Sequence, residues 1–276
     1  MWQYVDISDE NDPRLDVYLH LTEAQLRAKR ETEKGVCIAE AETVIEVALD
    51  AGCFPLSMLL DREMVSDRAK TLIGRCIERN PALEVYAADR ALLTKMTGFE
   101  LTRGLLAAFR RPEKKDPAAL LANARRIALL ENVSDAGNIG AILRSAAGIG
   151  FDAVLLTSDC CDPLTRRAMR VSMGTVFLVP WAYLEKGENV QEFFARNGFK
   201  TAAMALSDRS ISPDDKRLQS EERLAVLLGS EGQGLRKETI ENADYIVRIP
   251  MRNGVDSLNV AAASAVAFWA MRPKTQ

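Results

Sequence analysis

Continuous apolar segments alternate with helix-forming segments through the second half of the chain, and this alternation constrains its fold most strongly. The apolar segments are hydrophobic without a break, as in 225–228 (AVLL), so they suit strands that are covered on both faces. The pattern predicts an α/β fold with a parallel sheet, whose ligands bind in loops beyond the carboxyl ends of the strands. The predicted strands span 126–130, 153–157, 175–179, 201–205, 224–228 and 245–249, and the predicted helices span 139–149, 163–173, 190–197, 236–242 and 257–271.

The first 110 residues show a shorter version of the same alternation. It predicts a small α/β sandwich domain. Strands are expected at 36–39, 56–60, 83–87 and 104–109, and helices at 42–51, at 62–79 and from residue 89, after a charged, helix-prone stretch at 13–33.

A charged segment separates the two halves. Residues 110–117 (RRPEKKDP) hold six charged residues and two prolines. Proline disfavours helix at its own position and at the preceding one. We therefore place a linker at 111–118, between a domain of residues 1–110 and a domain of residues 119–276.

The composition excludes several classes of catalytic site. The chain has one histidine, His20, which excludes HExxH zinc sites, histidine-rich metal clusters and most Ser-His-Asp triads. Its five cysteines show no CxxC spacing, and Cys160 and Cys161 are adjacent, which suits reduced thiols better than a disulfide or a zinc site. The chemistry must therefore use Arg, Glu, Asp, Asn, Ser or a cofactor, and no metal is expected.

Charge and hydropathy bear on location and partners. No apolar run approaches the roughly 20 residues of a membrane span, and no signal peptide is visible, so we expect a cytoplasmic protein that does not enter a membrane. The net charge is −3; residues 1–110 hold 14 Lys and Arg against 19 Asp and Glu, and residues 111–276 hold 22 against 20. Any binding of nucleic acid must therefore use local basic patches.

Three loops that follow predicted strands carry the polar residues of interest. The first, 131–144 (ENVSDAGNIGAILR), opens a helix, and Gly137 and Gly140 permit a tight turn whose exposed amides can hold an anion. Asn138 and Arg144 lie six residues apart, so their side chains can point to the same side if the helix begins near residue 139. Taken alone, this loop is also explained by a capping asparagine and a surface arginine.

The second loop, 229–236 (GSEGQGLR), has three glycines in six residues directly after a strand. Such a run implies close approach of the backbone to another group. The spacing matches neither GxGxxG nor a phosphate-binding loop that ends in GK[ST], and Glu231 has little reason to be there for packing. A solvent-exposed turn is the alternative.

The third loop, 249–260 (IPMRNGVDSLNV), leads into an alanine-rich helix. Asp256 or Ser257 is expected to cap that helix, whereas Asn259 needs a hydrogen-bond partner or a function of its own. Because all three loops follow strands of one sheet, we expect them to form one composite pocket that suits a small polar cofactor.

In order and spacing, these loops resemble the signature motifs of the SpoU family, also called the TrmH family, of RNA ribose 2′-O-methyltransferases. The resemblance covers residues 125–272 and rests on 138–144 (NIGAILR), 170–177 (RVSMGTVF), 229–235, 249–251 (IPM) and 257–261 (SLNVA). Residues 29–41 and 47–52 are similar to the ribosomal-protein-L30e-like substrate-binding domain that many members carry.

The resemblance implies a SPOUT-type carboxyl-terminal domain with a deep trefoil knot, S-adenosylmethionine in the knotted loops, and a homodimer. By this resemblance, backbone groups hold the cofactor at Gly229, Ile249 and Leu258, and also at Gly234. The residues that it marks as catalytic are Asn138, Arg144, Glu231, Ser257 and Asn259.

Arg144 stands where the family has its catalytic arginine, often described as a base. A guanidinium has a pKa above about 12 and is seldom deprotonated. Our hypothesis is that Arg144 holds the phosphate beside the target ribose and stabilises the developing 2′-oxyanion. Proton removal would then fall to Glu231, to Ser257 through water, or to solvent.

The expected substrate is structured RNA, and the L30e-like domain favours ribosomal RNA over transfer RNA. Arg166 and Arg170 share a face of a predicted helix and are candidates to bind the RNA backbone, with a solvated helix face as the alternative. Arg30 is the candidate in the amino-terminal domain. The alternative functions are a transfer-RNA methyltransferase, a knotted homologue that binds RNA without methylating it, and a nucleotide-dependent α/β enzyme that uses the glycine loop for phosphate.

Overall fold

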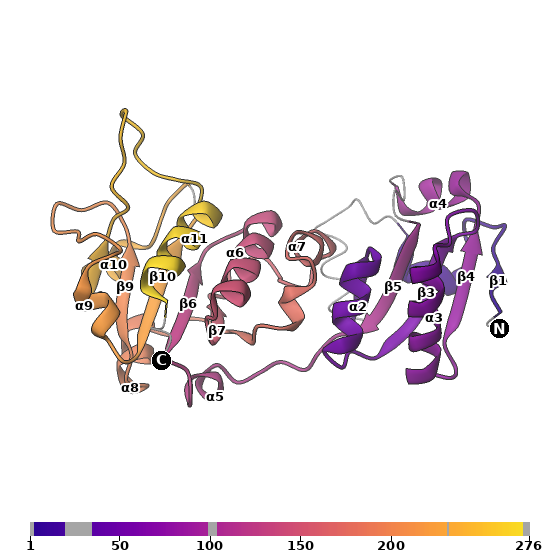
Figure 1. Cartoon of the computed structure of the whole chain (residues 1–276), viewed down its shortest axis with the longest axis horizontal. Coiled ribbons are helices and arrows are strands. Elements are labelled where there is room, and N and C mark those ends of the chain that lie inside the picture. The colour runs from indigo at the N-terminus through magenta and orange to yellow at the C-terminus, as the bar shows by residue number, and fades with distance from the viewer. Residues whose placement is uncertain (1–2, 20–34, 99–103, 231, 273–276) are drawn as a thin grey trace. The chain divides into compact units, whose positions relative to one another are not determined.

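The computed structural model describes residues 3–19, 35–98, 104–230 and 232–272. The chain divides into two compact units, Met1–Glu113 with Leu164–Phe177, and Lys114–Pro163 with Leu178–Gln276, which we call the first and second units (Figure 1). The first division falls inside the predicted linker. Residues 164–177, which the sequence pattern places in the second domain, group with the first unit. His20, Arg30 and Glu231 lie outside the described residues.

A five-stranded mixed sheet forms the centre of the first unit, in the order β1-β4-β3-β5-β2. The four predicted strands are confirmed, and β1 was missed because it has only two residues. Within the described residues the elements of this unit are β1 (Val5–Asp6), η1 (Pro13–Tyr18), β2 (Val36–Glu40), α2 (Glu42–Asp50), β3 (Pro55–Asp61), α3 (Asp67–Arg79), β4 (Glu84–Ala88), α4 (Arg90–Thr97), β5 (Leu105–Arg110), α7 (Arg166–Val171) and η2 (Thr175–Phe177).

Ala41, between β2 and α2, has φ 82° and ψ 142°, a conformation that glycine adopts far more easily than alanine. We expect Ala41→Gly to raise the free energy of unfolding by about 1 kcal/mol, because relief of this strain outweighs the added flexibility of glycine. The exposed Ala91 in α4 has ordinary helical surroundings, so Ala91→Gly should lower stability by about 1 kcal/mol. Urea unfolding of both variants tests this; equal losses of stability would show that Ala41 is unstrained.

The second unit contains a six-stranded sheet in the order β11-β9-β10-β6-β7-β8, and every neighbouring pair is parallel. The predicted parallel α/β sheet is therefore confirmed. Within the described residues the elements are α5 (Pro117–Leu121), β6 (Arg126–Glu131), α6 (Ala136–Ile149), β7 (Ala153–Leu156), β8 (Trp181–Tyr183), α8 (Val190–Arg196), β9 (Lys200–Met204), α9 (Lys216–Ser220), β10 (Leu224–Gly229), α10 (Lys237–Glu241), β11 (Tyr245–Val247) and α11 (Val260–Met271).

Helices bury the strands of the second unit, which explains their unbroken apolar sequences. Phe193 and Phe194 of α8 pack with Leu121 of α5 into a core that includes alternate strand residues such as Leu129 and Leu227. Helices α6 and α11 pack against each other (Figure 1). Because the strands are parallel, their carboxyl ends share one edge of the sheet, where the three loops of interest begin.

The strand predicted at 175–179 is wrong. Met173 and Gly174 have positive φ angles of 54° and 84°, and residues Thr175–Phe177 form the short 3-10 helix η2. The sixth strand is β8, which begins after Pro180. Although Pro180 has no amide proton to donate, its carbonyl accepts a hydrogen bond from the Val154 amide at 2.9 Å, and Trp181 then pairs with Val154. The strand therefore begins later than predicted, at Trp181, because the turn at Met173 and Gly174 and the proline at 180 precede it.

In the described part of the chain, no helix has the length and hydrophobicity that a membrane span requires.

Candidate active site

The glycine-rich loop after β10 folds back on its own first residue. A Cβ atom on Gly229 would lie 2.1 Å from the carbonyl carbon of Gly234 and 2.2 Å from the nitrogen of Leu235. The Gly234 amide donates to the Ser230 carbonyl at 2.8 Å, and Gly234 has φ 68°. The predicted close approach is therefore confirmed, and the group approached is the loop's own backbone.

A cavity of about 360 Å³, which we call the first cavity, lies beyond the ends of β9, β10 and β11. Its volume falls within the range of roughly 300–1,000 Å³ that is usual for small-molecule sites. The structure brings the four residues predicted to hold a cofactor together here, and Ser257 with them. The residues that line it include Leu206, Leu228, Gly229, Ser230, Gly232, Gln233, Gly234, Ile249, Met251, Asp256, Ser257, Leu258 and Val260.

A smaller cavity of about 250 Å³, the second cavity, adjoins the first and contains Asn138. The two cavities have four lining residues in common: Ser230, Gly232, Gln233 and Val260. The first predicted loop therefore meets the second and third at one place, as expected. Glu231, the remaining member of the predicted polar wall, lies outside the described residues.

Asn138 and Asn259 bind each other, and this contact joins α6 to α11. The Asn259 Nδ2 donates to the Asn138 Oδ1 at 3.2 Å. Asn259 also caps α11, because its Oδ1 accepts from the amide of Ala261 at 2.9 Å. The expectation that Asp256 or Ser257 caps this helix is therefore wrong. Asp256 and Ser257 instead lie in the exposed loop that lines the first cavity.

Helix α6 is capped by Asp135, whose carboxylate accepts from the Asn138 amide at 2.9 Å. Asn138 is thus inside the first turn rather than at the cap, and its side chain remains available to the second cavity. Arg144 is exposed, lines neither cavity, and forms no hydrogen bond or ion pair with a described residue. Six residues turn an ideal helix by about 600°, so Asn138 and Arg144 do not share a face.

Arg166 and Arg170 converge on one acidic side chain of the first unit, as their shared helix face allows. The Arg166 Nη1 lies 2.7 Å from the Glu40 Oε2, and the Arg170 Nη1 lies 3.4 Å from the Glu40 Oε1. Glu40 is buried, and the Arg166 side chain is only 16% exposed, against 49% for Arg170. Arg166 therefore stabilises a buried carboxylate, and Arg170 is the more accessible of the two cations.

Glu131, at the carboxyl end of β6, positions the segment that follows the glycine loop. Its side chain is fully buried. Its Oε1 accepts from the backbone amide of Arg236 at 2.5 Å, and its Oε2 accepts from the Thr239 hydroxyl at 2.7 Å. These bonds fix the start of α10, and with it the far end of the glycine loop. The only sequence signal for this role is an acidic residue at the end of a continuous apolar strand, and no role for Glu131 was predicted from it.

Removal of the Glu131 carboxylate should destabilise the second unit. We expect Glu131→Ala to lower the free energy of unfolding by about 2–4 kcal/mol, because it leaves a partly buried amide and a buried hydroxyl without an acceptor. Glu131→Gln should cost less, since its amide oxygen still accepts one bond. The exposed Glu192 of α8 provides the control, and Glu192→Ala should change stability by less than about 0.5 kcal/mol. Denaturant unfolding gives the comparison; equal effects at the two positions would contradict the assigned role.

Comparison with known proteins decides the family. The model of the SpoU rRNA Methylase family matches residues 125–269, from the start of β6 into α11. The chain belongs to the SpoU family. A Mycobacterium tuberculosis protein named an uncharacterized tRNA/rRNA methyltransferase is 37% identical over 265 residues, which cover 96% of this chain and 90% of that protein.

Two further matches, one of them a solved structure, also cover nearly the whole chain. The 23S rRNA (guanosine(2553)-2′-O)-methyltransferase RlmP of Bacillus subtilis is 28% identical over 249 residues, which cover 90% of this chain and 93% of RlmP. The crystal structure of an AdoMet-bound rRNA methyltransferase from Sinorhizobium meliloti has a TM-score of 0.83 at 21% identity, and the match covers 97% of each chain. The SpoU chain described here therefore has the fold of that structure in both units, and the predicted family is confirmed.

Proposed function

We propose that this SpoU family member transfers the methyl group of S-adenosylmethionine to a ribose 2′-hydroxyl of ribosomal RNA. The observation that carries the proposal is the junction of the two cavities, because it joins all the cofactor residues expected from the sequence to Asn138 and Asn259. The relatives support the substrate, since RlmP is named as a 23S rRNA 2′-O-methyltransferase. A cytoplasmic location is part of the proposal.

The first cavity fits S-adenosylmethionine in its chemistry. Leu206, Leu228, Ile249 and Leu258 supply apolar surface for a flat adenine ring, and the tight loop at Gly229 exposes backbone groups beside it. Ser257 and Asp256 add polar groups at the same wall. When bound, the cofactor supplies an electrophilic methyl group on a sulfonium.

Asn138 and Asn259 would orient the ribose. The Asn138 Oδ1 already accepts from Asn259, which leaves the Asn138 Nδ2 to donate to a ribose oxygen in the second cavity. The bond between the two side chains fixes that orientation, because Asn259 is itself held by the first turn of α11. Rigid orientation of reactants is worth several kcal/mol in favourable cases.

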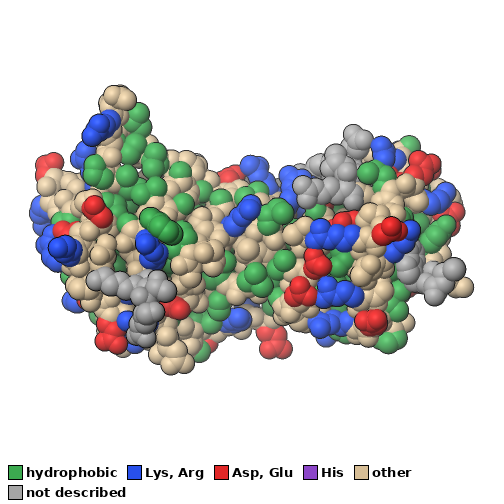
Figure 2. Space-filling view, viewed as in Figure 1, with side chains coloured by type: hydrophobic (Ala, Val, Ile, Leu, Met, Phe, Trp, Pro, Cys, Tyr) green, Lys and Arg blue, Asp and Glu red, His purple; other side chains and the backbone are tan. Residues whose placement is uncertain are grey.

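Arg144 would reach an active site in a homodimer. Arg144 lines neither the first nor the second cavity of its own chain. Its helix α6 packs against α11, and α11 exposes Val266 and Trp269 at 43% and 61%. Figure 2 shows hydrophobic side chains over α11 and the loop before it. Exposed apolar surface of this kind favours association with a second copy. We propose that the dimer places Arg144 beside the cavities of its partner, where its permanent charge stabilises the 2′-oxyanion.

The test uses the purified full chain with labelled S-adenosylmethionine and three acceptors: ribosomal RNA, transfer RNA and no RNA. We expect cofactor binding at one site per chain and methyl transfer to ribosomal RNA at least about tenfold faster than to transfer RNA. Faster methyl transfer to transfer RNA would show that transfer RNA, rather than ribosomal RNA, is the substrate. Cofactor binding without transfer to any RNA would favour the non-catalytic alternative, and failure to bind the cofactor would contradict the proposal as a whole.

A further inference from the structure

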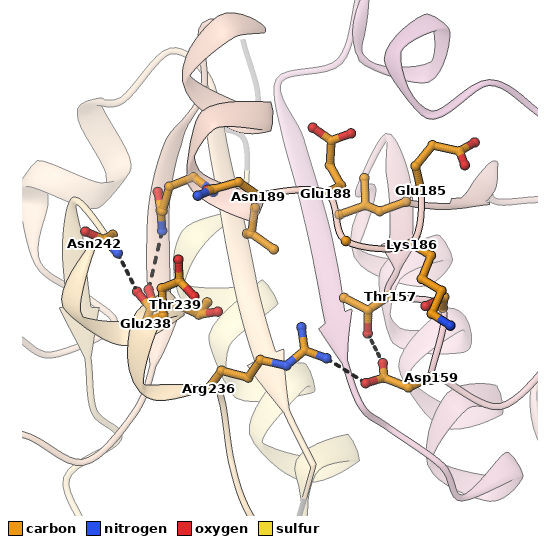
Figure 3. Close-up of a pocket in the computed structure, with 15 residues that line it drawn as sticks. Thr157, Asp159, Glu185, Lys186, Glu188, Asn189, Arg236, Glu238, Thr239 and Asn242 are labelled. Carbon is orange, nitrogen blue, oxygen red and sulfur yellow. Dashed lines mark hydrogen bonds and ion pairs between the residues drawn. The ribbon is translucent and has the colours of Figure 1, made fainter.

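A third cavity, the largest of the three, lies in the second unit and has no part in the function proposed above. Its volume is about 550 Å³. It is formed by residues that follow β7 and β8 and by the start of α10 (Figure 3). The residues that line it are 157–159, 184–191, Arg236, Glu238, Thr239 and Asn242.

The strand order puts the three cavities in a row along one edge of the sheet. The first cavity lies beyond β11, β9 and β10, the second beyond β10 and β6, and the third beyond β7 and β8. Asn132 connects the second and third, because it lines the second cavity and its amide donates to the Thr157 Oγ1 of the third at 3.1 Å. A ribose in the second cavity thus has the first cavity on one side and the third on the other.

Asp159 and Arg236 form the polar centre of the third cavity. The Arg236 Nη2 donates to the Asp159 Oδ2 at 2.7 Å, and the Thr157 hydroxyl donates to the Asp159 Oδ1 (Figure 3). Burial raises the pKa of Asp159, but the Thr157 hydrogen bond and the Arg236 charge together bring that pKa below its usual value. The carboxylate is therefore ionised at neutral pH. Its side chain is 39% exposed, so a ligand can reach it.

The other charges in the third cavity are mixed. Lys186 extends from the loop after β8 on the same side as Asp159 (Figure 3), is exposed, and forms no ion pair with any residue that the structure describes. Glu185 and Glu238 add negative charge, whereas Glu188 is paired with Arg196 at 2.9 Å. A cavity with this mixture repels a bare polyanion but suits a neutral, planar group that presents both donors and acceptors, with one phosphate near Lys186.

We propose that the third cavity binds a guanine base of the RNA strand whose ribose is methylated, an inference that rests on the function proposed above. Guanine presents two adjacent N–H donors, N1 and N2, on its Watson–Crick edge, and an ionised carboxylate accepts both. The Asp159 carboxylate is 39% exposed to the cavity, beside its bonds to Arg236 and Thr157. The guanidinium of Arg236 donates to the neighbouring O6 acceptor. Adenine, cytosine and uracil lack the paired donors that Asp159 requires.

Equilibrium dialysis of the four ribonucleoside 5′-monophosphates against the full chain tests the proposal. We expect guanosine monophosphate to bind about tenfold more tightly than the other three. Asp159→Asn should remove this preference, because an amide cannot accept both donors. Lys186→Glu, on an exposed loop, should weaken all four ligands alike, because a phosphate contact carries no base preference. Asp214→Asn, at an exposed aspartate outside the three cavities, is the matched control and should change nothing.

Binding of S-adenosylmethionine to the same proteins separates the two claims. Equal binding of the four nucleotides, or a guanine preference that survives Asp159→Asn, would overturn this inference while cofactor binding leaves the proposed function intact. Failure of the unaltered chain to bind S-adenosylmethionine would instead contradict the proposed function. Unchanged cofactor affinity in Asp159→Asn, together with lost guanine preference, is the result that supports both.

Discussion

Arg144→Ala should lower the kcat of methyl transfer by about a thousandfold and leave the affinity for S-adenosylmethionine within about threefold. The reason is that Arg144 lines neither the first nor the second cavity of its own chain, and that its proposed role in the partner's site is at the 2′-oxyanion rather than at the cofactor. A single donor or charge aimed at a developing oxyanion is worth about 10²–10³ in rate. Arg144→Lys should retain part of the activity if charge is what matters. Arg209→Ala, at an exposed arginine outside the cavities, is the control.

Mixed dimers decide which chain supplies Arg144. Leu258→Arg should block the first cavity and Arg144→Ala should remove the charge, so each homodimer is inactive on its own. If Arg144 serves the partner's cavity, a heterodimer of the two variants regains one intact active site, and mixing the proteins restores about a quarter of the activity, since half of the dimers are then mixed. If Arg144 serves its own chain, no combination restores activity. Persistent inactivity after confirmed subunit exchange would contradict the proposed arrangement.

Gly229→Ala should abolish cofactor binding and lower the free energy of unfolding by about 3 kcal/mol. The added methyl group would lie within 2.4 Å of three backbone atoms of Gly234 and Leu235, and backbone cannot move aside as a flexible side chain can. The loop that lines both the first and second cavities must then open.

Gly232 supplies the matched control in the same loop. A Cβ on Gly232 would meet no atom within 4 Å. Gly232→Ala should therefore change stability by less than about 0.5 kcal/mol and cofactor affinity by less than about tenfold. Isothermal titration with S-adenosylmethionine and urea unfolding provide the two readouts. Equal tolerance of alanine at both positions would mean that the loop does not fold back as described.

The strands of the second unit could be predicted because burial on both faces leaves an unbroken apolar record, as in 224–228. The strand after Pro180 could not, since an apolar run does not reveal the positive φ angles of Met173 and Gly174 that turn the chain first. Strand β1 leaves no pattern, because two residues are too few to show a period. The sequence predicted Asp256 or Ser257 as the cap of α11, whereas the structure has Asn259 there. Asp, Ser and Asn all cap helices well, and only the tertiary position of the loop selects one of them.

The candidate site shows the same division between local and tertiary information. Gly229 and Gly234 predicted that the backbone of this loop approaches another group closely. Only the fold shows that this group is the backbone of the loop itself. The family motifs placed Asn138 and Asn259 in one polar wall, but the hydrogen bond between them was not predicted. Glu131 was missed because its partners, Arg236 and Thr239, lie more than 100 residues away, and no spacing rule connects them. The trefoil knot and the L30e-like identity of the first unit stay predictions from the resemblance.

Alkaline hydrolysis of the methylated product tests the central claim most directly. Ribosomal RNA is incubated with the full chain and methyl-labelled S-adenosylmethionine, then hydrolysed with alkali and separated by size. A methyl group on the ribose 2′-oxygen blocks cleavage at that position, so the account predicts that the label appears in an alkali-resistant dinucleotide. Label recovered only in mononucleotides would place the methyl group on a base and would contradict the account.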